Sequence, residues 1–167
     1  MSNQSKGTSF AELNSGSSAS RVDERAPILL QGQIEIAAGR EAVWDVLAAI
    51  EGWPDWNPDV TSATLEGRLE PGTSFRWKSD GASLVSNLVR VDAPTEIAWT
   101  GRSLGIRVFH QYRLEERSGS TLVRTEESVA GVPARLFRGP LRRRMDRAIQ
   151  NQLRRLKAES ERRASAR

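Results

Sequence analysis

Two neighbouring stretches in the second half of the chain alternate between apolar and polar residues with a period of two. In residues 106–116, one face carries Ile106, Val108, His110, Tyr112 and Leu114. In residues 121–130, the matching face carries Val123, Thr125, Glu127 and Val129. A period of two over this length is typical of β-strands with one buried face. The chain is therefore expected to build a β-sheet around this pair of strands.

A polar segment rich in Ser and Gly, residues 117–120, separates the two stretches and predicts a hairpin turn. Pairing residue 116 with residue 121 places Tyr112 opposite Thr125 and His110 opposite Glu127. The only histidine of the chain then points inward beside an inward-facing glutamate. Such groups on an inner sheet face indicate either an unusually polar core or a binding cavity.

Further strands are predicted on the N-terminal side of this hairpin, at residues 28–36, 60–66, 73–79, 82–91 and 96–101. Asp80-Gly81, residues 92–95 and residues 102–105 predict the turns between the later strands. The register carried through these turns gives one inner face and one charged outer face, as in an antiparallel meander. The predicted inner face comprises Phe75, Trp77, Ser79, Leu84, Ser86, Leu88, Arg90, Ile97, Trp99, Val108, His110, Tyr112, Val123, Thr125 and Glu127.

Helices are predicted near both ends of the sheet-forming region. Apolar spacing indicates a short helix over residues 40–50, followed by a compact turn in the segment GWPDWNP. From Leu136 onward, apolar residues recur every three or four positions with arginines between them, so a long amphipathic helix is expected. Gly139-Pro140 should kink or restart this helix. The predicted fold class is α+β, with the long C-terminal helix laid across a strongly curved antiparallel sheet.

The length and composition of the chain exclude several classes of protein. With 167 residues, the chain predicts one domain, over residues 27–165, after a disordered tail at residues 1–26. It has no cysteine, which rules out disulfides, and no apolar run long enough for a membrane span. The first 20 residues lack the apolar core of a secretory signal, so a cytoplasmic location is expected.

Positive charge is concentrated at the C-terminus. The net charge is +4, but residues 135–167 hold twelve Lys and Arg against Asp146, Glu159 and Glu161. This favours a solvated outer helix face, with contact to an acidic partner left open. No aromatic residues lie among the arginines of the helix body to stack on bases, so no specific nucleic acid partner is expected. A monomer or a homodimer is expected.

Several motifs together resemble the START-like, helix-grip (SRPBCC) superfamily, which includes Bet v 1-type allergens and polyketide cyclases/dehydrases. They are REAVWDVLAAIEGWPDWNPDV, GTSFRWKS, VDAPTEIAWTGRSLGIRVFHQYRLE and GSTLVRTEES, and the resemblance runs from about residue 28 to residue 164. It implies a curved sheet gripping a long helix, and a cavity between them that binds a hydrophobic, lipid- or polyketide-like small molecule. It assigns no catalytic residues, because the superfamily shares no catalytic motif that can be placed here.

The sequence therefore predicts a carrier or sensor of a hydrophobic small molecule, without catalysis and without a cofactor or metal. The candidate ligand-binding residues are Trp77, Ser86, Leu88, Arg90, Trp99, Val108, His110, Tyr112, Thr125 and Glu127. The alternative is a polyketide cyclase/dehydratase-type enzyme in which His110 and Glu127 serve as the acid–base pair. Burial should lower the pKa of His110. If the two side chains are in direct contact, Glu127 should raise that pKa, and the effect of the partner should then dominate.

The sequence argues against two other kinds of site, a serine hydrolase site and a zinc site. Gly101–Gly105 spells G-x-S-x-G, the motif that carries the nucleophile of α/β-hydrolases, but it lies between two predicted strands and no acid separates its serine from the histidine. A zinc site would need carboxylates for all but one of its ligands, because the chain has one histidine and no cysteine.

Overall fold

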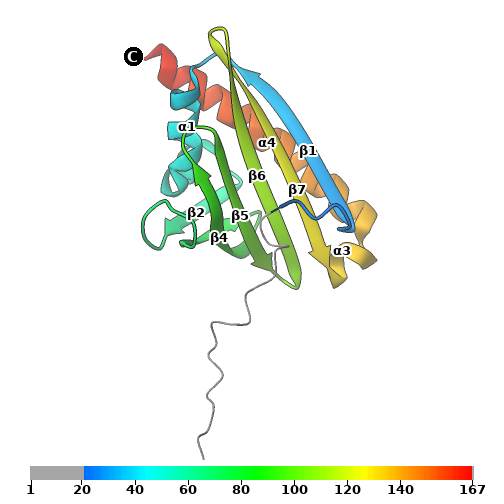
Figure 1. The fold of residues 1–167 in the computed structure, drawn as a ribbon. Coiled ribbons are helices and arrows are strands. Elements are labelled where there is room, and N and C mark those ends of the chain that lie inside the picture. The colour runs from blue at the N-terminus through cyan, green and yellow to red at the C-terminus, as the bar shows by residue number, and fades with distance from the viewer. Residues whose placement is uncertain (1–20, 167) are drawn as a thin grey trace, which may run out of the picture.

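The computed structural model describes residues 21–166, in which a single antiparallel sheet curls around one long helix (Figure 1). The strand order is β1-β7-β6-β5-β4-β3-β2, so only β1 lies out of chain order, next to the last strand. The strands are β1 (Ile28–Ile36), β2 (Val60–Leu65), β3 (Ser74–Ser79), β4 (Ala82–Asp92), β5 (Glu96–Ser103), β6 (Ile106–Arg117) and β7 (Ser120–Gly131). The predicted α+β class is confirmed.

The helices lie between β1 and β2 and after β7. They are α1 (Arg40–Ala48), η2 (Ile50–Gly52), α2 (Trp53–Trp56), α3 (Val132–Leu136) and α4 (Arg138–Ser165). The predicted long helix thus restarts at Phe137 rather than kinking, and Pro140 lies in the first turn of α4, where its missing N–H costs no helical hydrogen bond. In Figure 1, α4 runs behind the sheet as seen by the viewer, diagonally across it.

The C-terminal half of α4 packs directly on the sheet. Ile149, Leu153 and Leu156 are buried and belong to the main core, as their spacing predicts. Gly32 of β1 lies beneath them, because a Cβ at this position would come within 2.8 Å of Leu153 Cδ1. Only glycine leaves room there, so this position sets how closely α4 approaches β1.

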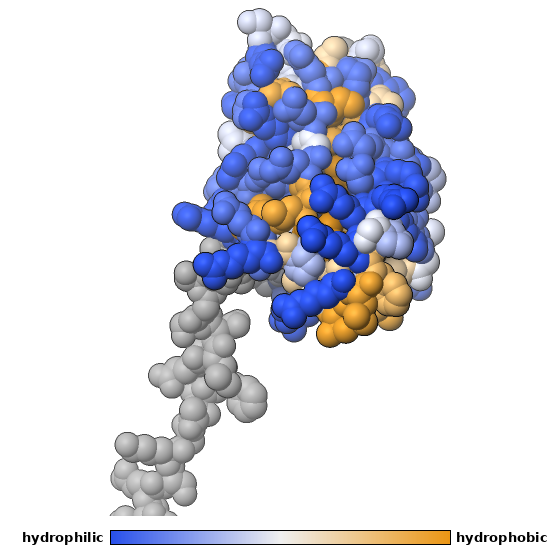
Figure 2. Space-filling view, turned by 90° about the vertical axis from the view of Figure 1, so that its right-hand side faces the viewer, coloured by the Kyte–Doolittle hydropathy of each residue, from blue (hydrophilic) through white to orange (hydrophobic). Residues whose placement is uncertain are grey.

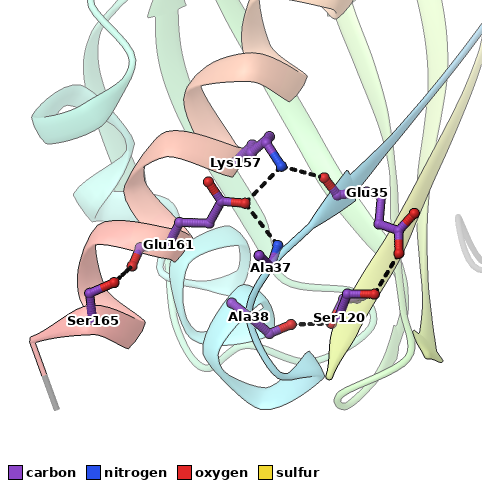
Figure 3. A network of polar contacts seen from close by, with 8 residues as sticks. Glu35, Ala37, Ala38, Ser120, Lys157, Glu161 and Ser165 are labelled. Atoms are coloured by element: carbon purple, nitrogen blue, oxygen red, sulfur yellow. Dashed lines mark hydrogen bonds and ion pairs between the residues drawn. The ribbon is translucent and has the colours of Figure 1, made fainter. Parts of the chain in front are cut away.

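Polar contacts fasten the C-terminal end of α4 to the loop after β1 (Figure 3). Lys157 Nζ donates to the carbonyl oxygen of Glu35 at 2.7 Å, and the backbone N–H of Ala37 donates to Glu161 Oε1 at 2.8 Å. Lys157 also contacts Glu161 Oε1 at 2.7 Å, which joins the two contacts into one network. This end of the helix is therefore held by polar as well as apolar contacts.

The register of the central hairpin agrees with the prediction. His110 pairs with Glu127, Tyr112 with Thr125, and Leu114 with Val123. Two other parts of the predicted register are wrong. The turn between β5 and β6 is the two-residue Leu104-Gly105, so His110 pairs with Trp99 rather than with Ile97.

A bulge in β4 reverses the predicted orientation of Arg90. The register shifts between Leu88 and Arg90, so Arg90 pairs with Ala98 and leaves the inner face. On the outer face its Nη1 donates to Glu96 Oε1, and Glu96 also lies 3.6 Å from the guanidinium of Arg113. Arg90 is therefore withdrawn from the predicted inner face.

Residues 1–20, most of the predicted disordered tail, lie outside the described residues. Residues 21–26 form no helix or strand, and the backbone N–H of Asp23 donates to Ser128 Oγ at 3.2 Å on the outer face of β7. Among the described residues, no helix is long and apolar enough to cross a membrane.

Candidate functional site

A cavity of about 380 Å³ lies between the inner face of the sheet and the N-terminal half of α4. The sheet wall comprises Trp77, Ser79, Leu84, Ser86, Trp99, Gly101, Val108, His110 and Glu127. The helix wall comprises Leu141, Arg144, Met145, Ala148, Ile149 and Gln152. At the rim lie Asn57, Asp59, the β3–β4 turn and the β5–β6 turn. The cavity therefore lies on the sheet-facing side of α4 between Leu141 and Gln152, ahead of the buried Leu153 and Leu156.

Small side chains keep this space open. Gly101 of β5 lies on the inner face opposite Ser86, and a Cβ there would come within 3.1 Å of Ser86 Oγ. On the opposite wall, Ala148 of α4 also lines the cavity with a small side chain. Leu141 and Met145 are only half-buried, so their side chains contact the cavity as well as the core.

Aromatic rings form one side of the cavity. Trp77 and Trp99 line it, and the Trp77 indole N–H donates to Ser86 Oγ at 3.1 Å, which fixes the ring. Trp53 of α2 packs behind both rings, with centroid distances of 5.5 Å to Trp77 and 5.6 Å to Trp99. Its own N–H donates to the carbonyl oxygen of Leu47 at 2.9 Å, so Trp53 has a packing role.

The protonation state of His110 follows from its hydrogen bonds. The Thr125 hydroxyl has one proton, which it donates to the carbonyl oxygen of Gln111 at 3.0 Å. The 2.8 Å contact between Thr125 Oγ1 and His110 Nε2 therefore requires Nε2 to be the donor. In a neutral ring, Nδ1 then carries the lone pair and is a hydrogen-bond acceptor.

Burial makes the two buried ionisable groups of the cavity wall, His110 and Glu127, neutral. It lowers the pKa of His110 from 6.5 to about 3 and raises the pKa of Glu127 from 4.5 to about 8. No hydrogen bond joins these two described side chains, since the imidazole donates to Thr125 instead. The expectation that direct contact with Glu127 would raise the pKa of His110 therefore does not apply, because the two side chains make no such contact and loss of water lowers the pKa of His110.

The predicted site residues fall into three groups. The structure places Trp77, Ser86, Trp99, Val108, His110 and Glu127 in the cavity wall. Leu88, Tyr112 and Thr125 do not line it and are buried beside it, where Tyr112 stacks on His110 with ring centroids 4.8 Å apart. Arg90 lies on the opposite face of the sheet and cannot reach the cavity.

Asn57 and Asp59 at the rim were missed by sequence reasoning. Arg155 of α4 donates to Asn57 Oδ1 and to Asp59 Oδ2, both at 2.6 Å, and so ties the loop after α2 to the helix. Their place in the segment WPDWNPD, after a compact turn, was the available signal. The cavity-lining residues of α4, such as Ala148 and Gln152, could not be identified from the sequence beyond their helical spacing. The position of the helix over the sheet is a tertiary property.

Comparison with known families gives a match over residues 27–161 to the model described as "Polyketide cyclase / dehydrase and lipid transport". No curated protein matches the chain.

Solved structures with the same fold are distant in sequence. A hypothetical protein from Helicobacter pylori has a TM-score of 0.74 at 17% identity, covering 96% of this chain and 99% of that one. A START superfamily protein from Mycobacterium smegmatis has a TM-score of 0.61 at 18% identity, covering 83% and 97%. StfQ, a di-domain ARO/CYC from the steffimycin biosynthetic pathway, has a TM-score of 0.67 at 18% identity, covering 83% and 53%. Identities this low establish the fold alone.

Proposed function

The chain belongs to the polyketide cyclase/dehydrase and lipid transport family, and we propose that it binds a neutral, mainly apolar small molecule in the cavity beneath α4. The observation that carries this proposal is a largely apolar cavity containing two buried ionisable groups that are both neutral at pH 7. A cavity of about 380 Å³ lies within the usual range for small-molecule sites.

The cavity wall suits a ligand with a planar apolar body and one polar oxygen. The indole rings of Trp77 and Trp99 offer flat apolar surface. The protonated Glu127 carboxyl can donate a hydrogen bond, and neutral His110 can accept one at Nδ1. A ligand carbonyl or hydroxyl therefore has a partner on β6 or β7. Beside His110 and Glu127 a charged ligand group is disfavoured, because neither of these neutral side chains offers an opposite charge to offset its desolvation.

The proposed ligand contacts are Trp77, Ser86, Trp99, Val108, His110 and Glu127 from the sheet, with Met145 and Ala148 from α4. We do not extend the proposal to catalysis. His110 Nε2 is already hydrogen-bonded to Thr125, and a general base of pKa about 3 would be a weak one at neutral pH.

A cavity-filling substitution tests this proposal. Ala148→Phe places a phenyl ring in the cavity, whereas Ala158→Phe adds the same ring to an exposed position of the same helix. We expect wild type and Ala158→Phe to bind Nile red, a neutral planar dye, with equal affinity. Ala148→Phe should bind it at least about tenfold more weakly, because the volume that the dye needs is occupied. Fluorescence titration measures the affinity, and native mass spectrometry detects any molecule that co-purifies with wild type.

Circular dichroism and thermal unfolding establish that both variants are folded. Equal binding of the dye by folded Ala148→Phe and Ala158→Phe would refute the proposal, because the dye would then be bound elsewhere.

A further inference from the structure

Large apolar side chains project into solvent beside the mouth of the cavity. Leu104 of the β5–β6 turn is 85% exposed, Leu136 of α3 is 72% exposed, and Phe137 between α3 and α4 is 62% exposed. Val132, at the start of α3, is 67% exposed. In Figure 2, an orange patch lies at the lower end of the molecule, where Figure 1 places α3, with hydrophilic side chains beside it.

The β5–β6 turn and α3 are in direct contact. A Cβ at Gly131, the residue before α3, would lie 2.2 Å from the carbonyl oxygen of Gly105, and a Cβ at Gly105 would lie 3.8 Å from Pro133 Cδ. The exposed side chain of Leu104, in the adjacent turn position, therefore belongs to the same end of the molecule as the apolar side chains of α3. We call these four residues, Leu104, Val132, Leu136 and Phe137, the mouth patch.

Leu104 has a backbone conformation with positive φ, which leucine rarely adopts. Both residues of the β5–β6 turn have positive φ, 48° at Leu104 and 77° at Gly105. The β3–β4 turn, at the same end of the sheet, has nearly the same angles, 50° and 78°, and there the sequence is Asp80-Gly81, which this turn type favours. A leucine at positive φ with 85% of its surface exposed stabilises neither the turn nor the core. A role for the projecting side chain outside the fold explains it.

Unpaired arginines lie between and directly after the mouth-patch residues of α3, and continue along the first three turns of α4. Arg135, Arg138, Arg142, Arg143 and Arg147 are exposed, and none has an ion pair or hydrogen bond with a described residue. Along the rest of α4 most basic side chains have an acidic partner. Arg155, Lys157, Arg162 and Arg163 are paired with acidic side chains, whereas Arg154 donates to Asn151. The uncompensated positive charge of α4 is thus concentrated at its N-terminal end, beside the apolar patch.

We propose that the mouth patch and these five arginines dock the protein on an anionic lipid bilayer. Apolar side chains enter the boundary between headgroups and acyl chains, and arginines beside them are attracted to anionic headgroups, so the two features together match this one surface. Neither feature alone provides stable attachment, and their adjacency lets them act together. Docking in this orientation brings the cavity-lining residues Leu104, Leu141 and Arg144 close to the membrane. The inference goes beyond ligand binding and can be tested without any ligand.

The test is co-sedimentation of the full-length protein with vesicles of phosphatidylcholine alone or with about one third phosphatidylglycerol. We expect wild type to bind the anionic vesicles and to be released as salt is raised, with little binding to neutral vesicles. Arg138→Glu/Arg142→Glu should weaken binding on the order of tenfold or more, since each basic residue near an anionic surface contributes about fivefold.

Arg68→Glu/Arg117→Glu is the matched control. Both residues are exposed and have no ion pair with a described residue. Arg68 lies in the β2–β3 connection, and Arg117 is the last residue of β6, so both lie away from the mouth patch. β3 has six residues and β6 has 12, so Arg68 and Arg117 lie roughly 20 Å and 35 Å along the strands from the turns beside the mouth patch. Both distances exceed the Debye length of about 8 Å at physiological salt, and the control should bind as wild type does.

Leu104→Asn separates docking from folding. It creates an Asn-Gly turn, which is favoured at these positive φ angles, so the fold should be at least as stable as that of wild type. Vesicle binding should nevertheless fall several-fold, because an apolar contact with the bilayer is lost.

Four results would overturn the docking proposal. They are failure of wild type to bind anionic vesicles, unchanged binding by Leu104→Asn, an equal loss in the two arginine pairs, and tighter binding to DNA or RNA than to vesicles at the same ionic strength.

Discussion

At the scale of single residues, buried neutral groups shape the cavity chemically. Thr125 donates to the Gln111 carbonyl and accepts from His110, so its hydroxyl fixes the orientation and tautomer of the ring. Glu127, on the neighbouring strand, is kept protonated by burial, which raises its pKa to about 8. These residues provide one acceptor and one donor without a net charge. The cost of holding them neutral should appear in how stability depends on pH.

Glu127→Gln should change that dependence in a defined window. Below pH 4.5 the carboxyl is protonated in both folded and unfolded states, so it does not destabilise the fold. As the pH rises from 4.5 to about 8, the unfolded state releases this proton first, and wild type loses stability. The glutamine side chain of the variant does not titrate in this window. The free energy of unfolding of the variant should therefore rise relative to that of wild type by up to about 1.4 kcal/mol per pH unit.

His110 has the opposite effect on stability in an overlapping window. The folded-state pKa of His110, about 3, lies below the ordinary value of 6.5. The stability of the fold is therefore unaffected by this group above pH 6.5 and falls as the pH drops from 6.5 towards 3, because the unfolded state takes up the proton first. In wild type the two effects oppose each other between about pH 4.5 and 6.5, and Glu127 alone acts from about 6.5 to 8. Urea unfolding at several pH values measures both. Glu126→Gln on the outer side of β7 is the control, and curves for Glu127→Gln parallel to wild type would contradict the assignment.

At the scale of elements, α4 has two halves with different tasks. Its C-terminal half buries Ile149, Leu153 and Leu156 against the sheet. Its N-terminal half, from Leu141 to Ala148, faces the cavity and is only half-buried on that side. The change occurs where Gly32 of β1 allows the helix to lie close to the sheet. The helix contacts the sheet closely at Gly32 and lies further from it towards Leu141, and the space between them there is the cavity.

A double-mutant cycle tests the contact at Gly32. Gly32→Ala should destabilise the protein by roughly 1–3 kcal/mol, because its Cβ would lie 2.8 Å from Leu153 Cδ1. Leu153→Ala should cost about 2–5 kcal/mol through the cavity that it leaves. In the double variant Leu153 Cδ1 is absent, so the closest steric contact is removed. The double variant should therefore lose less stability than the sum of the two single losses, by at least about 0.5 kcal/mol. Chemical denaturation measures each step, and strict additivity would show that this contact does not set the helix position.

At the scale of the whole molecule, one end is held tightly and the other is open. The C-terminal end of α4 is fastened by Lys157 and Glu161 to the loop after β1, as Figure 3 shows. Arg155 holds the middle of the helix to Asn57 and Asp59. At the N-terminal end, Arg144 contacts the carbonyl oxygen of Asp80 at 3.3 Å, and both side chains are exposed. The helix is thus anchored away from the cavity mouth.

Hydrogen exchange should follow this difference between the ends. Amides from Ile149 to Ser160 should exchange only through near-global unfolding, because this segment buries Ile149, Leu153, Leu156 and Ser160 and its end of the helix is fastened. Amides from Leu141 to Ala148 should exchange at least roughly tenfold faster through local opening. Nile red should slow exchange in the second group more than in the first. Uniform protection along α4, with and without dye, would contradict an opening at the cavity mouth.

The alternation of apolar and polar residues decided most of the fold in advance. Alternation in β6 and β7, with a short turn between them, is enough to pair His110 with Glu127, because a strand's side-chain period is fixed by its backbone. Helical spacing from Leu141 to Leu156 likewise identifies the buried face of α4. Both are local properties, and each can be read from a few residues in a row.

Only the tertiary structure decided what lies around the cavity and which charges are buried. The bulge after Leu88 turned Arg90 outward, and the tighter β5–β6 turn paired His110 with Trp99. Neither change breaks the local alternation strongly enough to be read in advance. The neutral states of His110 and Glu127 depend on how completely α4 and the sheet exclude water. That is a sum over residues distant in the sequence, so only the assembled fold determines it.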